Sequence, residues 1–139
     1  MARAAGATPE APAVVREVTV EGEPSSAPGM TLQMVQYTIP GNIALPAHTH
    51  PGMQVNTIVS GTLTYTVVEG EAVITRANGT AETLSSGETT DLTAGDTLTE
   101  PEGMVHFGVN HHDEPIVIRT ASLFASDEAP SALADVATA

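Results

Sequence analysis

The sequence contains no cysteine, no lysine and no tryptophan among its 139 residues. Without cysteine there are no disulfides, thiolate nucleophiles or thiolate metal ligands, so any bound metal must be held by nitrogen and oxygen atoms. Without lysine, neither Schiff-base chemistry nor a P-loop phosphate site is available. These absences exclude several large classes of enzyme.

Positive charge is also scarce. Four arginines stand against 17 aspartates and glutamates, which gives a formal net charge of −13 at pH 7. A chain this acidic repels the phosphate backbone of nucleic acids, so we expect no nucleic-acid partner.

Long apolar runs are missing. No segment approaches the length of about 18 apolar residues that a membrane span needs, and the N-terminal stretch "MARAAGATPEAPAVV" lacks the continuous apolar core of a signal peptide. We therefore expect no membrane association and a cytoplasmic location. The alternative is a secreted protein whose signal sequence has been trimmed.

Short segments rich in Val, Ile, Leu and Thr, separated by turn residues, make up most of the chain. This rhythm is typical of all-β sandwiches and barrels. We expect one domain: a flexible arm at 1–13, a barrel at 14–125 and a tail at 126–139. The helix-like composition of the tail predicts a short helix, with Ser131 as its N-cap. The predicted strands are 14–21, 30–39, 43–49, 53–60, 62–69, 71–77, 80–85, 89–92, 96–100, 105–110 and 115–124.

Two histidines and a glutamine in "PAHTHPGMQ" form the first candidate site. If residues 48–54 are extended, His48, His50 and Gln54 stand at positions i, i+2 and i+6 and point to one face. That face would offer two imidazoles and an amide oxygen to a metal. His-x-His pairs also occur by chance, so two exposed histidines in a proline-flanked loop are an equal alternative from this stretch alone.

A second motif, "GDTLTEPEGMVHFGVN", makes the metal site the better interpretation. It has the spacing of the second cupin motif, in which Gly, five residues, Pro-x-Gly, two residues, His, three residues and Asn follow one another. The matching residues are Gly95, Pro101, Gly103, His106 and Asn110. Inward side chains of neighbouring barrel strands converge, so His106 is expected to meet His48, His50 and Gln54.

The first cupin motif resembles the segment from Gly41 to Gly61, with two departures. One extra residue precedes His48, and Gln54 stands where the motif has glutamate. Residues 30–124 thus resemble a small single-domain cupin, which implies a double-stranded β-helix barrel. The resemblance also implies a homodimer, because cupins often exchange N-terminal strands, and a small-molecule substrate or ligand as the partner.

The predicted metal ligands are His48, His50, Gln54 and His106, and this nitrogen and oxygen set suits Mn, Fe, Zn, Ni or Co. A neutral Gln54 in place of glutamate leaves a divalent site with a charge of +2 instead of +1, which favours Lewis-acid chemistry. The alternative is that Gln54 only hydrogen-bonds to the site and three histidines alone bind the ion.

The pattern His-x-His-x3-Gln with a later His is similar to that of bacterial cupin hydroxynitrile lyases. The leading functional hypothesis is therefore a metal-dependent lyase or isomerase, with hydroxynitrile-lyase activity as one specific form. Two alternatives stay open: an iron-dependent dioxygenase, and a cupin that binds a metal or small ligand without catalysis.

Few other residues offer acid–base chemistry. Tyr65, in phase with Leu63 and Val67, either packs in the core or points its hydroxyl at the pocket. His111 lies one residue beyond the second motif and is the other catalytic candidate, although its turn-like context favours exposure. Met53 is expected in the apolar wall of the pocket, and Arg119 on the outer face of its strand. No general base is identified.

Overall fold

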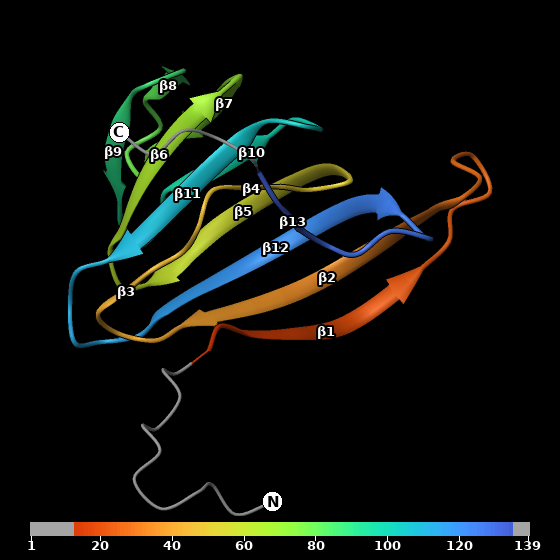
Figure 1. Cartoon of the computed structure of the whole chain (residues 1–139), viewed down its shortest axis with the longest axis horizontal. Helices are drawn as coiled ribbons and strands as arrows, with labels where there is room; N and C mark the ends of the chain where they lie inside the picture. Colours follow the sequence, from red (N-terminus) through yellow and green to blue (C-terminus); the bar gives the residue numbers. More distant parts are fainter. Residues whose placement is uncertain (1–12, 135–139) are drawn as a thin grey trace, which may run out of the picture.

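The computed structural model describes residues 13–134, and its regular secondary structure there consists of β-strands alone. The strands form two antiparallel sheets, and Figure 1 shows the long strands of the larger sheet lying side by side beneath those of the smaller one. The larger sheet has the order β1 (Val15–Gly22), β2 (Met30–Ile39), β12 (Ile116–Ala125), β5 (Gly52–Ser60), β10 (Thr97–Glu100), β7 (Glu71–Thr75) and β8 (Ala81–Ser85). The smaller has the order β13 (Ala132–Leu133), β4 (His48–Thr49), β11 (Val105–Asn110), β6 (Leu63–Glu69) and β9 (Thr89–Leu92), with β3 (Ile43–Ala44) also paired to β11.

The all-β fold predicted from the sequence is confirmed, and the strands fall close to the predicted segments. One segment differs. Residues 43–49 form two short strands, β3 and β4, because Pro46 between them has no N–H to donate to a sheet. No helix in the described residues is long and apolar enough to cross a membrane.

The predicted helix in the C-terminal tail is wrong for the part of the tail that the structure describes. Ala132 and Leu133 form β13, which pairs with β4, and the Ala134 N–H donates to the Ala47 carbonyl at 3.0 Å. Helix propensity is a weak preference, and an open strand edge that offers backbone partners outweighs it here. The rest of the helix prediction, at 135–139, and the arm at 1–12 lie outside the described residues.

Alternating burial along the strands places the core between the sheets. In β12, Ile116, Ile118 and Thr120 are buried while Arg119 is exposed, as the sequence predicts. The main apolar cluster comprises Ile39, Ile58, Leu63, Tyr65, Val67, Ala72, Ile74, Leu84, Leu92, Leu98, Met104, Ile116 and Ile118. Two motif glycines sit at tight turns with left-handed backbone, Gly61 at φ 86° and Gly95 at φ 91°.

A candidate metal centre

Three histidines converge at one end of the smaller sheet. His48 on β4 and His106 on β11 are directly paired across the strands, and their ring centroids lie 4.3 Å apart. The His50 ring lies 5.0 Å from that of His48 and 5.1 Å from that of His106. One nitrogen from each ring falls within 4.8 Å of the others, a spacing that could hold a metal ion.

Gln54 reaches this cluster by a different route from the one expected. Residues 48–54 are not one extended strand: β4 ends at Thr49 in the smaller sheet, and β5 begins at Gly52 in the larger sheet. Pro51, which cannot donate to a sheet, lies at the crossing between them. The Gln54 amide nitrogen nonetheless lies 3.3 Å from His50 Nε2, because the two sheets meet at this crossing.

Hydrogen bonds fix the orientation of two of the rings. His48 Nδ1 donates to the Pro46 carbonyl at 2.8 Å, and His50 Nδ1 donates to the Pro130 carbonyl at 2.7 Å. A carbonyl can only accept, so Nδ1 carries the proton and Nε2 of each ring presents a lone pair toward the cluster. In His50 this lone pair accepts from the Gln54 amide.

Both of these rings are neutral at neutral pH. Burial, followed by the neighbouring His106, lowers the pKa of His48 from 6.5 to about 4. Burial also lowers the pKa of His50. Metal binding requires unprotonated imidazoles, so both rings are ready to bind without first releasing a proton.

The most important residue that the sequence reasoning missed is Glu100. Its side chain is 3% exposed at the end of β10, directly opposite Gln54 on β5. One carboxylate oxygen accepts from the Gln54 amide at 2.5 Å and from the Asn56 amide at 2.9 Å. The other accepts from the Tyr65 hydroxyl at 2.7 Å and lies 3.0 Å from His106 Nε2.

Glu100 is ionised in this environment. Burial alone would raise the pKa of Glu100, but the neighbouring His106 and the hydrogen bonds from His106 and Gln54 hold it well below its usual range. The expected charge of +2 counted the ligands alone; a neighbouring strand adds the Glu100 carboxylate beside Gln54 and His106. Alternation in β10, where Leu98 and Glu100 share the inward face, was the signal that could have placed it.

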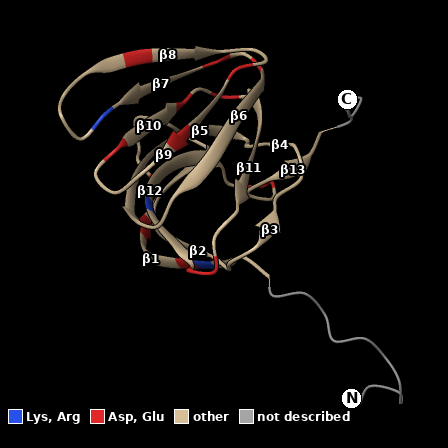
Figure 2. Cartoon of the chain, turned by 90° about the vertical axis from the view of Figure 1, so that its left-hand side faces the viewer, with Lys and Arg blue, Asp and Glu red and all other residues tan. Residues whose placement is uncertain are grey.

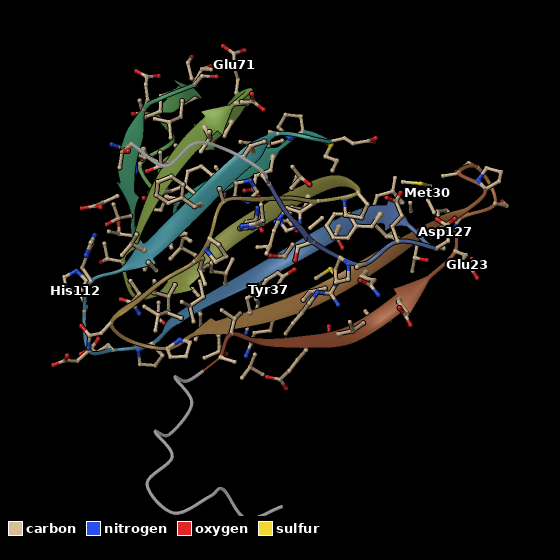
Figure 3. All side chains as sticks on the ribbon, in the orientation of Figure 1. Glu23, Met30, Tyr37, Glu71, His112 and Asp127 are labelled. Carbon is tan, nitrogen blue, oxygen red and sulfur yellow. The ribbon has the colours of Figure 1, made fainter. Side chains whose placement is uncertain are left out.

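The two catalytic candidates have different outcomes. Tyr65 is 2% exposed, packs in the core and also points its hydroxyl at Glu100, so both interpretations hold at once. Burial and the Glu100 carboxylate raise the pKa of Tyr65 far above its usual range. His111 is exposed beyond the far end of β11 from His106, and its neighbour His112 lies at the left-hand edge of Figure 3. His111 therefore does not reach the cluster.

A cavity of about 240 Å³ opens beside the histidines. Its walls are mainly aliphatic, with Ile39, Leu45 and Ile58 among them, and Gln54, Tyr65 and Glu100 also line it. The cavity is somewhat smaller than most ligand pockets, which favours a small molecule. Met53, expected in its wall, is instead 46% exposed, because it lies on the outward face of β5.

Two buried polar atoms at the site lack a hydrogen-bond partner among the described residues. They are Gln54 Oε1 and His106 Nδ1. Buried polar atoms without partners are costly, and such atoms are satisfied when a ligand or ion completes the site. Together with the unprotonated Nε2 atoms of His48 and His50, they form a donor set that fits a divalent transition metal.

Comparison with solved structures gives the same fold. A cupin superfamily protein from Desulfitobacterium hafniense is similar with a TM-score of 0.56 and 11% identity, over 85% of this chain and 84% of that one. A chain from crystal structures of DMSP lyases is similar with a TM-score of 0.56 and 14% identity, over 75% of this chain and 44% of that one. Oxalate oxidase in complex with the substrate analogue glycolate is similar with a TM-score of 0.52 and 16% identity, over 73% of this chain and 45% of that one. At these identities the likeness shows the fold alone.

Among curated proteins, none matches the sequence. The family model described as "Cupin" matches residues 8–134, which is most of the chain, and it includes both histidine motifs. The chain therefore belongs to the cupin family.

Proposed function

We propose that this cupin is a metal-dependent enzyme that acts on a small molecule by lyase or isomerase chemistry. The observation that carries the proposal is the convergence of His48, His50 and His106 beside an ionised carboxylate in the wall of an apolar cavity. The three histidines would hold a divalent ion such as Zn, Fe, Mn, Ni or Co, with Gln54 Oε1 as a fourth ligand.

The side chains around the cavity divide the chemistry between them. A bound divalent ion supplies Lewis-acid polarisation of a substrate oxygen. Glu100 lines the same cavity and accepts the proton that the substrate loses. Because the pKa of Glu100 is low, this transfer needs a substrate proton made acidic by the adjacent polarised group.

Tyr65 and Asn56 act on Glu100 as positioning residues. Each donates one hydrogen bond to a different carboxylate oxygen, which fixes the orientation of the group. Tyr65 keeps its proton because its pKa is strongly raised, so it serves as a donor and not as a base.

Hydroxynitrile-lyase activity is the specific form that the His-x-His-x3-Gln motif suggests. In that reaction the base takes the hydroxyl proton of a cyanohydrin, and the carbon–carbon bond to the nitrile breaks to give a carbonyl compound and cyanide ion. Glu100, which lines the cavity, would take this proton and return it to the cyanide, which leaves as hydrogen cyanide.

The carboxylate beside three histidines also favours a second candidate, an iron-dependent dioxygenase, since iron oxygenases bind their metal through histidine and carboxylate groups. Fold similarity does not separate the two, because the similar structures include lyases and an oxidase.

The test is an NMR assay of metal-loaded protein with acetone cyanohydrin and a panel of small hydroxy acids, in air and under nitrogen. We expect turnover of at least one compound in both atmospheres, and none with His106→Ala. Turnover only in air would contradict the lyase proposal and favour the dioxygenase. No turnover of any compound would favour a cupin that only binds its ligand.

A further inference from the structure

One cationic side chain faces the same cavity as the histidines. Arg16 on β1 is half-buried and lines the cavity together with His48 and His50. The other arginines of the described chain are placed elsewhere: Arg76 pairs with Asp96 and Glu82, and Arg119 is exposed on the outer face of β12.

Neutral groups hold the guanidinium of Arg16 in position. Its Nε donates to the Tyr37 hydroxyl at 3.1 Å, and its Nη2 donates to Gln33 Oε1 at 2.7 Å. The guanidinium carbon Cζ lies 5.8 Å from the centre of the Tyr37 ring. These contacts use two of five N–H donors. Within residues 13–134, Arg16 forms no ion pair, although the chain carries a net charge of −13.

A nearby carboxylate does not take up this charge. Glu128 lines the smaller hollow that adjoins Arg16, but the two form no ion pair. Glu21 receives a hydrogen bond from Gln33, at 2.6 Å, and so touches Arg16 only through that neutral amide. Within residues 13–134, the remaining N–H donors of Arg16 are therefore available to an anion in the cavity.

The strand register relates Gln33, which the Arg16 guanidinium contacts, to Gln54 at the candidate metal centre. Gln33 on β2 is paired with Ser122 on β12, which is paired in turn with Gln54 on β5. Two inter-strand spacings separate the backbones of Gln33 and Gln54 by about 10 Å. Arg16, His48 and His50 line the same cavity, so one small molecule in it is within reach of both the guanidinium and the histidines.

Charge and shape fix which end of a ligand goes where. A carboxylate fits the guanidinium, whose parallel N–H groups match its two oxygens. Arg16 is the one arginine among the described residues that line the cavity, so the cavity offers a partner to one carboxylate. The aliphatic walls between the two ends suit a short carbon chain.

We propose that Arg16 makes this cavity a receptor for small monocarboxylates, held by the carboxylate at Arg16 with the reacting carbon toward the histidines. This inference rests on the proposed function for the role of the histidines, and it narrows the substrate class. It favours short acids over uncharged cyanohydrins.

The experiment measures binding of butanoate and of its neutral analogue butanamide by calorimetry, with zinc-loaded protein and with protein treated with EDTA. We expect butanoate to bind at least tenfold more tightly than butanamide, and Arg16→Gln to weaken butanoate at least tenfold. Arg119→Gln, which removes the same charge from the outer face, is the matched control and should change nothing. Equal butanoate binding by wild type and Arg16→Gln overturns the inference, as does binding that depends on zinc but not on Arg16.

A second measurement on the wild type needs no variant. In ¹⁵N spectra of the arginine side chains, butanoate should shift the Nε signal of Arg16 and leave that of Arg119 in place. No shift of the Arg16 signal contradicts the inference, even if Arg16→Gln fails to fold.

Failure of the proposed function is distinguishable from failure of this inference. If the protein binds butanoate through Arg16 in EDTA but neither retains a metal nor turns over any compound, the carboxylate site stands and the enzyme proposal falls. If metal and oxygen-independent turnover are present but Arg16→Gln keeps full affinity, the enzyme proposal stands and the carboxylate site falls.

Discussion

Glu100 is the residue that most changes the chemistry of the site. It returns to the metal centre the negative charge that Gln54 lacks, but from β10 and not from the first histidine motif. Its carboxylate also lines the cavity. Four neighbouring side chains contact this carboxylate and hold it in one orientation.

We expect Glu100→Gln to lower kcat on any substrate found by at least 100-fold, because the proton acceptor is lost while the shape is kept. The assay is turnover of the metal-loaded variant. Glu102→Gln, at an exposed position two residues later, should keep wild-type activity. Near-normal turnover by Glu100→Gln would show that the base lies elsewhere.

For single residues of the site, the sequence could predict the histidines but not the side chains that contact them. Motif spacing places His48, His50 and His106, and strand alternation places Glu100 on the inward face. Alternation does not tell which inward residues meet across a barrel. The pairing of Gln54 with Glu100 depends on the register of β5 against β10, which no local pattern encodes.

Among the elements, the crossing from β4 to β5 decides whether the site forms. Gly52, the first residue of β5, lies so close to β12 that an added Cβ would clash with the Leu123 carbonyl oxygen. That atom belongs to the backbone, so it cannot rotate away. A side chain at this position must push β5 from β12 and move Gln54 away from His50.

Gly52→Ala should therefore destabilise the fold by about 1–3 kcal/mol, the usual cost of overpacking, and weaken metal binding. Urea unfolding and a zinc titration measure the two effects. Gly22→Ala is the matched control, since a Cβ there has no atom within 4 Å and should change neither quantity. An unaltered zinc affinity in Gly52→Ala would mean that the crossing does not position the ligands.

The sequence predicted the strands better than the connections between them. Hydrophobic alternation and turn residues found nearly every strand, but the extended stretch considered at 48–54 is divided between β4 and β5, which belong to different sheets. Pro51 indicates a break, yet only the tertiary structure decides that the chain changes sheet there. The tail illustrates the same limit, because β13 forms only where the edge of β4 is available.

For the whole molecule, the pH dependence of stability follows from the buried imidazoles. The pKa of His48 falls from 6.5 in the unfolded chain to about 4 in the fold, so between these values the unfolded chain binds a proton that the fold does not. Stability is therefore full above pH 6.5 and decreases as the pH falls toward 4. The loss is on the order of 3 kcal/mol for the metal-free protein.

Urea unfolding of the EDTA-treated protein at pH 7 and pH 4.5 measures this loss. His48→Gln should reduce the difference between the two pH values. His111→Gln, which removes an exposed histidine, should leave the difference as in the wild type. The account of His48 fails if its removal leaves the pH dependence unchanged.

The homodimer stays a prediction, and the outer face of the larger sheet offers it a surface. Acidic residues are visible on β8 and in several loops in Figure 2. By contrast, Val20, Leu32, Met34, Met53 and Val55 form an exposed apolar group on neighbouring strands. Apolar groups of this kind often mark protein interfaces.

Light scattering should give twice the mass of one chain. Met34→Glu should give a monomer, because a buried unpaired charge is costly. Thr83→Glu, which adds the same charge to an exposed position on β8, should stay dimeric. A wild-type protein that is monomeric at high concentration would contradict the prediction.

The central claim, that the three histidines form a metal centre, is tested most directly by elemental analysis of protein purified without a histidine tag and without added metal. The account predicts about one equivalent of a divalent transition metal in the wild type and a small fraction of that in His106→Ala, with His111→Ala as the matched control that keeps it. Stoichiometric metal in a folded His106→Ala protein would contradict the claim.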